Sequence, residues 1–493
     1  MNLDKLDLNK VEYKKLFLIL AVAYLAIRLT LISYVPFMQD EGLYAVMIEE
    51  QIAHPTLVTT YLGYEVGWKP PLFFWISGFF VQFLRDLPIP IEAVYRLPTI
   101  LFGLINVFLV FFIFEKTTKR KDLAFLIALA YVTVGVCIHT ELRVLTDTIC
   151  GTFIYAGILA YLNISKGNHW LLLGAIFTFL AYFTKQYTAA IVPFFAVAYV
   201  FQNDRKKLFA PLFVISLLAF PLAALAEDAT RGWGLGNTTA IVTNNTLIKN
   251  LNWAHIGGSL IAIFAYTAAF FIFSLFGFWK NWKEDYAMSV WYLLMVFPFI
   301  AGALMTFYFY PVIPVMVYFT ITVLSRDGKK IKLDKFFYLV YFMVLILGLC
   351  LSIATHISYR ELLLLQKDVG DFLAGKENVM IIGAYGPGIQ SYKVLDEIRT
   401  NGSALDYGLI ISDNNETTES YQRFVDNYMV ERDDVIDGNF KWAFMITDKI
   451  YRKSTNVTDF DYICLVGNVS QNVTVDGELV LENQYISVYK KGG

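Results

Sequence analysis

Long apolar runs separated by short polar segments fill the first 357 residues of the chain. A helix needs roughly 20 predominantly apolar residues to cross a membrane. Runs near this length, some of them shorter, occur at residues 16–35, 97–114, 123–138, 148–164, 170–183, 189–201, 208–226, 256–278, 288–307, 310–324 and 336–356. The pattern therefore predicts a polytopic α-helical membrane protein with about 11 transmembrane helices.

One further apolar run, residues 72–84, is short for a span, and the distribution of basic residues described below favours an interfacial position for it. It follows Pro70 and Pro71 and ends at Arg85. A segment of this length is more typical of an interfacial or re-entrant helix than of a membrane span. We therefore predict an interfacial helix between the first and second spans.

The distribution of lysine and arginine predicts the orientation of the chain. Four lysines precede the first span, and cytoplasmic loops collect basic residues. With residues 72–84 in the interface, the basic clusters at 116–121, 203–207, 280–283 and 326–330 all fall on the cytoplasmic side. The N-terminus is thus predicted to be cytoplasmic, in a multi-pass protein of the cell membrane.

The pattern changes at about residue 358. Short β-branched or apolar runs at 379–384, 409–411, 442–446, 462–466 and 486–489 alternate with polar segments and with helix candidates at 388–399 and 419–431. This alternation is typical of a small α/β domain with a partly parallel sheet. We therefore predict two domains, a membrane domain over 1–357 and an extracytoplasmic soluble domain over 358–493.

Composition agrees with the membrane prediction and excludes several classes. Hydrophobic residues make up 57% of the chain and charged residues only 17%, with a mean hydropathy of +0.52. A net charge of −2 without a long basic tract gives no indication of nucleic-acid binding. Four scattered cysteines imply neither a disulfide framework nor a metal cluster, and no cofactor is expected.

Charged residues gather at the predicted outer ends of the spans and suggest chemistry there. They are Asp40, Glu41, Lys69, Arg143, Asp147 and Lys185. Cations bind a phosphate through charge-assisted hydrogen bonds, and a carboxylate can take a proton from a hydroxyl nucleophile. Ionisable groups beside hydrocarbon are costly and are therefore candidate functional residues.

Each of these residues also has a purely structural interpretation. The acidic pair could be a solvated loop, and Lys69 could extend from a helix end to the interface. Asp147 could cap the helix that follows it, and Lys185 could be an interfacial anchor. Arg143 could pair with Glu141 or with a lipid headgroup.

A set of short motifs resembles the GT-C superfamily of membrane glycosyltransferases. The likeness is to the branch with the protein O-mannosyltransferases and the lipid A aminoarabinose transferase, and it extends over about residues 14–314. The motifs are Asp40-Glu41 with Tyr44, Lys69-Pro70-Pro71-Leu72, Arg96-Leu97-Pro98, Arg143 through Asp147, Thr184-Lys185, and Tyr310-Pro311-Val312-Ile313-Pro314. Gln186 stands where the family has a glycine after the lysine. Their order and spacing together, rather than any single motif, carry the resemblance.

The resemblance implies an inverting transfer of a sugar, such as mannose, from a polyprenyl or dolichyl monophosphate on the outer face of the membrane. By this resemblance Asp40, Glu41 and Asp147 are the catalytic carboxylates, with Asp40 accepting the proton of the acceptor hydroxyl. The donor phosphate is held by Lys69, Arg143 and Lys185. Tyr44, Arg96 and Tyr310 contact the substrates. No metal is required.

The acceptor and two other functions stay open at this point. The acceptor could be a glycan, a lipid or a protein hydroxyl. An oligosaccharyltransferase or glycan ligase of the same superfamily would use a pyrophosphate donor and metal-binding carboxylates. A transporter without chemistry would place charges within its spans, whereas the charges here are expected to gather near the ends of the spans.

Overall fold

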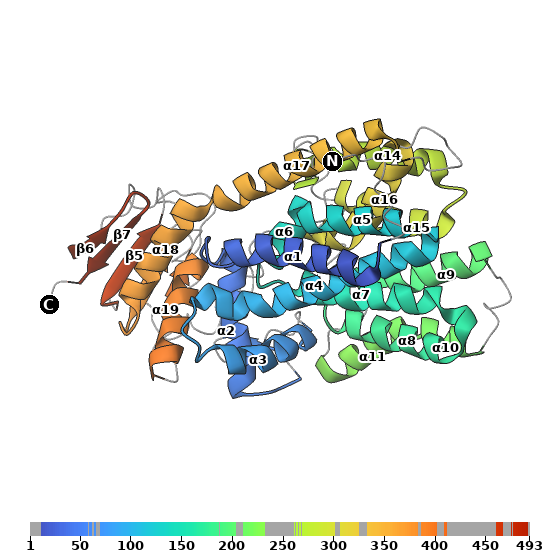
Figure 1. Ribbon diagram of the computed structural model, residues 1–493. Coiled ribbons are helices and arrows are strands. Elements are labelled where there is room, and N and C mark those ends of the chain that lie inside the picture. Colours follow the sequence, from blue (N-terminus) through green and yellow to red (C-terminus); the bar gives the residue numbers. More distant parts are fainter. Residues whose placement is uncertain are drawn as a thin grey trace. The chain divides into compact units, whose positions relative to one another are not determined.

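The computed structural model is mainly helical and describes most of the chain (Figure 1). The described residues are 11–57, 59–61, 64–65, 70–186, 188–203, 211–231, 261, 263–264, 266–267, 269–300, 306–324, 333–382, 386–401, 409–411, 460–466, 475 and 477–491.

The contacts between its residues divide the chain into two compact units. Unit 1 comprises Met1–Ile32, Trp68–Ile76 and Arg96–Ile357, and unit 2 comprises Ser33–Gly67, Ser77–Tyr95 and Ser358–Gly493. The C-terminal segment thus shares a unit with two segments from the N-terminal part of the chain. The division at residue 357 into a membrane and a soluble domain stays a prediction.

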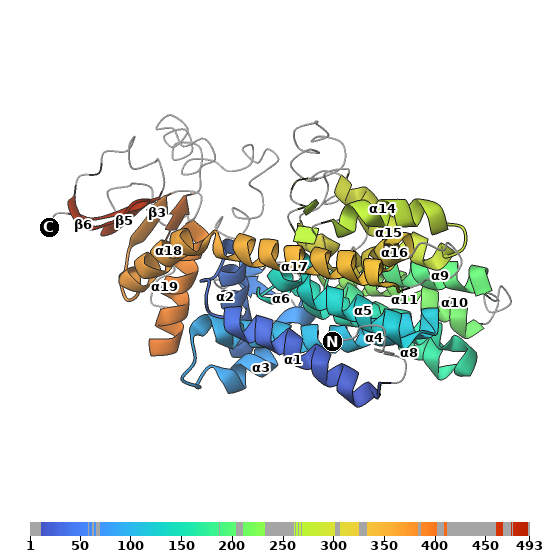
Figure 2. The ribbon, with the colours of Figure 1, turned by 45° about the horizontal axis from the view of Figure 1, so that its top comes forward.

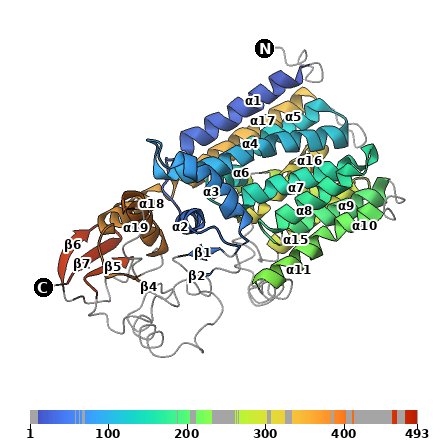
Figure 3. The same ribbon diagram turned by 90° about the horizontal axis from the view of Figure 1, so that it is seen from below.

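Unit 1 is a bundle of apolar helices. Its described helices are α1 (Tyr13–Leu31), α4 (Ile91–Thr118, whose first turns belong to unit 2), α5 (Lys121–Thr133), α6 (Gly135–Glu141), α7 (Thr146–Leu162), α8 (His169–Tyr182), α9 (Ile191–Asn203), α10 (Pro211–Leu217), α11 (Ala219–Arg231), α14 (Phe270–Asn281), α15 (Tyr286–Ile300), α16 (Ile313–Leu324) and α17 (Lys335–Ile357). Three 3-10 helices, η3 (Ile164–Lys166), η4 (Thr188–Ala190) and η7 (Thr306–Val312), join them. Helix α8 packs against α7, α10 and α11 (Figure 3).

Most of the predicted apolar runs coincide with these helices, but two of them are broken. The predicted interfacial helix has the bounds of α3 (Leu72–Leu84). The run at 123–138 is bent by 59° at a break between α5 and α6, beside Val134. The run at 208–226 is divided into α10 and α11. The predicted loop carrying Asp40 and Glu41 is instead helical and forms α2 (Gln39–Ala53).

Only some of these helices are long enough to cross a membrane on their own. Among the described residues, two segments meet the length and composition of a span, Ile91–Thr118 and Lys335–Leu373, and the bent pair α5–α6 would make a third. Several other apolar helices have 10–17 residues. The count of 11 spans therefore stays a prediction.

Unit 2 combines α2 with the C-terminal α/β elements. Its other described elements include most of α3, the hairpin β1 (Thr60–Tyr61) and β2 (Tyr64–Glu65), the helices α18 (Arg360–Leu373) and α19 (Gly386–Asn401), and the strands β3 (Val379–Ile382), β4 (Leu409–Ile411), β5 (Tyr462–Val466), β6 (Glu478–Glu482) and β7 (Ile486–Lys490). Helices α18 and α19 lie side by side, next to the sheet (Figure 2).

The five-stranded sheet has the order β4-β3-β5-β7-β6. Strand β3 is parallel to β4 and β5, whereas β7 is antiparallel to β5 and β6, so the sheet is partly parallel as predicted. Its core joins Ile381 of β3 and Val488 of β7 to Leu373 of α18 and Ile389 of α19. The sequence does not predict strand β6, because its three apolar residues stand between two exposed glutamates and none of its residues is fully buried. The predicted strand at 442–446 and helix at 419–431 lie outside the described residues.

Candidate active site

Asp147 and Lys185 form a buried ion pair in unit 1. Asp147 lies in the first turn of α7, and Lys185 follows the end of α8. The Lys185 Nζ donates to Asp147 Oδ1 at 2.5 Å, and the two residues are only 7% and 2% exposed. The residue in the capping position of α7 is Leu145, so Asp147 does not cap the helix through its side chain. The capping interpretation is wrong, and the interfacial anchor does not describe a buried lysine.

The start of α3 contacts the segment that precedes Lys185. The backbone N–H of Leu72 donates to the carbonyl oxygen of Phe183 at 3.4 Å, and Pro70 and Pro71 are buried. Because proline has no backbone N–H, burying these two residues leaves no donor without a partner. Two motifs predicted to share a site therefore lie together in unit 1. Lys69 itself lies outside the described residues.

The acidic pair Asp40-Glu41 begins α2 in unit 2. The Glu41 carboxylate is buried and accepts the N–H of Met38 at 2.8 Å, which satisfies a donor at the helix N-terminus. Asp40 is half-buried in the same first turn, where the helix dipole favours a negative charge. Tyr44 lies one turn further along the same helix and is buried.

Arg96 is buried in α4 and contacts the end of α1. Its Nη1 donates to the carbonyl oxygen of Ile32, the C-terminal cap residue of α1, at 2.7 Å. A cation at a helix C-terminus satisfies an unpaired carbonyl and complements the helix dipole. This bond gives Arg96 a structural role, and its predicted contact with substrate stays a prediction.

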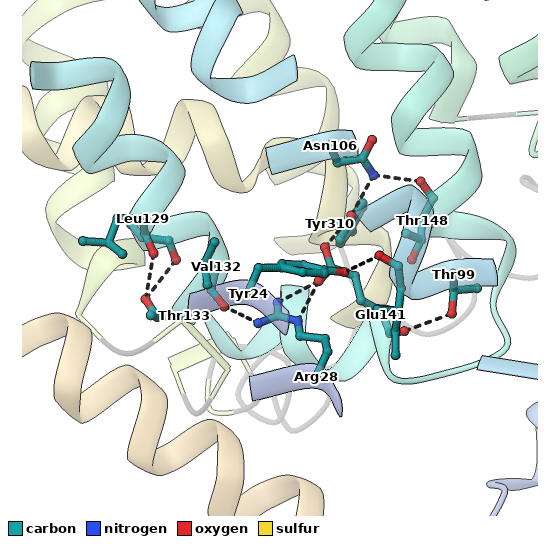
Figure 4. Close-up of polar contacts among 12 residues, drawn as sticks. Tyr24, Arg28, Thr99, Asn106, Leu129, Val132, Thr133, Glu141, Thr148 and Tyr310 are labelled. Atoms are coloured by element: carbon teal, nitrogen blue, oxygen red, sulfur yellow. Dashed lines mark hydrogen bonds and ion pairs between the residues drawn. The ribbon is translucent and has the colours of Figure 1, made fainter. Parts of the chain in front are cut away.

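A second charged network lies deep in unit 1 and centres on Glu141 (Figure 4). Arg28 of α1 donates to Glu141 Oε2 from Nε at 2.9 Å and from Nη2 at 2.7 Å, and both residues are fully buried. The Tyr310 hydroxyl donates to Glu141 Oε1 at 2.7 Å. The guanidinium also lies over the Tyr24 ring, 4.5 Å from its centroid. Both carboxylate oxygens of Glu141 are thus engaged, and its partner is Arg28 rather than Arg143.

The bend between α5 and α6 supplies a further acceptor to this network. The last four carbonyls of a helix have no partner within it. One of them, the carbonyl of Val132, accepts a hydrogen bond from Arg28 Nη1. On the other side, Asn106 Nδ2 donates to the Tyr310 hydroxyl at 2.9 Å and to the Thr148 carbonyl at 3.0 Å. The network therefore connects α1, α4, α5, α6, η7 and α7.

Arg143 lies in the short turn between this network and the ion pair. The turn joins α6, which ends at Glu141, to α7, which begins at Thr146. The Arg143 N–H donates to the Thr140 carbonyl at 3.4 Å, and the Leu145 N–H donates to the Arg143 carbonyl at 2.9 Å. Glu141 before the turn and Asp147 after it both bind residues from other segments of the chain. The turn that carries Arg143 is therefore held in place at both ends.

Sequence reasoning missed Arg28 and Asn106, and it mentioned Glu141 only as a partner for Arg143. Arg28 lies within the predicted span 16–35, in the last turn of α1, and is fully buried. An ionisable residue in an apolar span is itself a signal of function or of a buried partner. Among the residues that the structure describes, no group of three or more His, Cys, Asp or Glu side chains is placed to hold a metal ion.

Comparison with known families gives a match over part of the chain. Residues 68–226 match the model of the dolichyl-phosphate-mannose-protein mannosyltransferase family. This segment contains the ion pair, Arg143 and Glu141. Sequence comparison with curated proteins gives no significant match.

Solved structures share the fold at low sequence identity. ArnT from Cupriavidus metallidurans in the apo state matches with a TM-score of 0.63 and 13% identity over 97% of this chain and 98% of that one. The same protein bound to undecaprenyl phosphate matches with a TM-score of 0.61 and 12% identity over the same shares of the two chains. The archaeal oligosaccharyltransferase AglB from Archaeoglobus fulgidus, in complex with an inhibitory peptide and a dolichol-phosphate, matches with a TM-score of 0.53 and 12% identity over 92% of this chain and 69% of that one.

The two kinds of match agree with the motifs. The family match covers the segment with the ion pair, and the structural matches extend over nearly the whole chain. Residues 68–226 therefore resemble the dolichyl-phosphate-mannose-protein mannosyltransferase family, and the fold of the chain resembles those of ArnT and AglB.

Proposed function

We propose that this protein transfers a sugar from a polyprenyl or dolichyl monophosphate to an acceptor hydroxyl, with inversion at the anomeric carbon. The sugar is mannose or a similar hexose. The reaction takes place on the outer face of the cell membrane, in a multi-pass protein with a cytoplasmic N-terminus. The acceptor is a glycan, a lipid or a protein hydroxyl.

The buried Asp147–Lys185 pair is the observation that carries this proposal. A lysine held in one position inside the protein is a preorganised cation, and such groups stabilise charge that develops in a transition state. A monophosphate leaving group gains negative charge as its bond to the sugar breaks. We assign Lys185 to this phosphate, together with Arg143 and Lys69, and we assign Asp147 the additional task of orienting Lys185.

The comparisons support a lipid phosphate as the donor. The matched family is described by dolichyl-phosphate-mannose, and the ArnT structure was solved with undecaprenyl phosphate bound. The AglB structure contains a dolichol-phosphate. The fold is therefore known to accommodate a polyprenyl phosphate in other proteins.

The proposed step exchanges one bond at the anomeric carbon. The acceptor oxygen attacks this carbon while the bond to the phosphate oxygen breaks, and the phosphate leaves with the electron pair. The acceptor proton passes to Asp40, and Glu41 acts beside it by fixing the first turn of α2. A phosphate leaves without being protonated, so no separate general acid is needed. Tyr44, Arg96 and Tyr310 are assigned to substrate contacts.

Asp40→Asn is expected to lower kcat about 10²-fold, because the amide cannot accept the acceptor proton. The measurement is sugar transfer by purified full-length protein from a synthetic polyprenyl-phosphate sugar. Asp86→Asn makes the same change at an exposed carboxylate after α3 and is expected to leave the rate unchanged. Full activity in the Asp40 variant would refute the assignment of the base.

A comparison of donors separates the proposal from its nearest alternative. Transfer is expected from a polyprenyl monophosphate sugar and is expected to persist in the presence of a chelator. The alternative is an oligosaccharyltransferase of the same superfamily, which AglB represents. Transfer only from a pyrophosphate donor, or loss of transfer with the chelator, would favour that alternative.

A further inference from the structure

Helix α19 of the C-terminal segment packs directly against α2, the helix that carries Asp40. The closest approach is between Gly42 and Ser391. A Cβ atom placed on Gly42 would lie 2.6 Å from the Ser391 Cβ and 2.8 Å from its Oγ. Only a glycine allows this approach, so the two helices touch nearly at their backbones, two residues after Asp40.

Tyr392, the next residue of α19, contacts the residues that lead into α2. Its hydroxyl oxygen accepts the N–H of Phe37 at 2.6 Å, and the hydroxyl donates to Glu92 Oε1 at 2.9 Å. The Tyr392 ring also stacks on the Phe37 ring, with the centroids 5.4 Å apart. Phe37 lies two residues before α2, so Tyr392 holds the chain where the helix begins.

Helix α18 adds two contacts to the same region of unit 2. Lys367 Nζ lies 2.8 Å from Glu92 Oε1, the same oxygen that accepts from Tyr392. Arg360 Nε donates to the carbonyl oxygen of Tyr34 at 2.9 Å, and its guanidinium lies 4.6 Å from the Tyr34 ring centroid. The residues that precede α2 are therefore held by both C-terminal helices.

We propose that the C-terminal segment positions the catalytic carboxylate, and that Ser391 and Tyr392 are positioning residues for Asp40. The segment is thus a structural part of the active site rather than an attached module. The effect on catalysis rests on the proposed role of Asp40 as the base. The structural part of the proposal, that α19 holds the first turn of α2 in place, does not depend on that role.

The experiment introduces bulk at the helix contact in the full-length protein. Ser391→Leu places a larger side chain against Gly42. Gly42→Ala adds a single carbon on the other side of the same contact. Thr400→Leu adds a similar side chain at an exposed position of α19 and is the matched control. Tyr392→Phe removes only the hydroxyl and serves as a mild variant if Ser391→Leu does not fold.

Two measurements are compared for every folded variant. Hydrogen exchange of the amides in residues 37–44 reports whether α2 is still held, and steady-state kinetics give kcat and the KM for the lipid donor. Ser391→Leu is expected to speed exchange in this segment and to lower kcat between about 10-fold and 10²-fold, because small displacements of a catalytic group are costly. The KM for the donor is expected to change less than about twofold, and the control is expected to match the wild type.

The outcomes distinguish this proposal from the proposed function. Unchanged exchange in residues 37–44 for Ser391→Leu and Gly42→Ala would overturn the support by α19. Faster exchange with unchanged kcat would overturn the positioning role. If the wild type transfers no sugar from any polyprenyl monophosphate, the proposed function fails, while the exchange experiment still tests the support of α2.

Discussion

Lys185→Met is expected to lower kcat for sugar transfer between about 10²-fold and 10³-fold, because the leaving phosphate loses a preorganised cation. The same change removes the Lys185 ammonium from the buried Asp147 carboxylate. Stability is therefore also expected to fall, by several kcal/mol, since breaking a buried pair is far more costly than replacing it.

A double variant separates the two effects of Lys185→Met. Adding Asp147→Asn removes the buried negative charge, so the thermal midpoint in detergent is expected to recover in large part, whereas kcat is not. Lys166→Met changes an exposed lysine of η3 and is expected to alter neither quantity. Recovery of kcat together with stability would show that Lys185 acts only through folding.

Arg28→Met is expected to destabilise unit 1 by about 3–5 kcal/mol, because Glu141 would be left fully buried without its cation. Combining it with Glu141→Gln is expected to restore much of the stability, since no charge then remains in the network. Lys15→Met offers a contrast, because the Lys15–Glu12 contact is 3.7 Å long and the two side chains are 69% and 72% exposed. Exposed pairs contribute about 0–1 kcal/mol. Unfolding measured in detergent gives all three values.

The catalytic consequence of this network is a separate expectation. Both Arg28 and Tyr310 bind Glu141, and Glu141 ends the helix that precedes the turn with Arg143. The stable double variant Arg28→Met with Glu141→Gln is therefore expected to keep its fold and to transfer sugar more slowly. Wild-type kcat in that variant would show that the network serves stability alone.

Much of the helical part could be predicted from the sequence, because apolar runs and prolines act locally. The bounds of α3 follow from Pro70 and Pro71 before it and Arg85 after it. The sequence does not predict the ion pair between Asp147 and Lys185, only that both residues lie near one site. That expectation depends on counting spans and basic loops, which places two distant segments on one side of the membrane.

Other features depend on contacts that a local pattern does not contain. The partner of Arg28 lies on another helix far along the chain, and the bend at Val134 has no proline to mark it. The acidic residues and Gly42 in its first turn favour a loop where the structure has helix α2. In the structure Glu41 caps the helix, and the glycine serves the contact with Ser391. The role of the glycine becomes visible only when the C-terminal segment is in place.

The contact between Gly42 and Ser391 also constrains how sequences with this fold can diverge. A side chain at position 42 can be accommodated only if position 391 becomes smaller or α19 moves away. The two positions are therefore expected to vary together among homologues, with a small residue at one wherever the other carries a Cβ or a larger group. Such covariation would tie the evolution of the C-terminal segment to that of the acidic motif near the N-terminus.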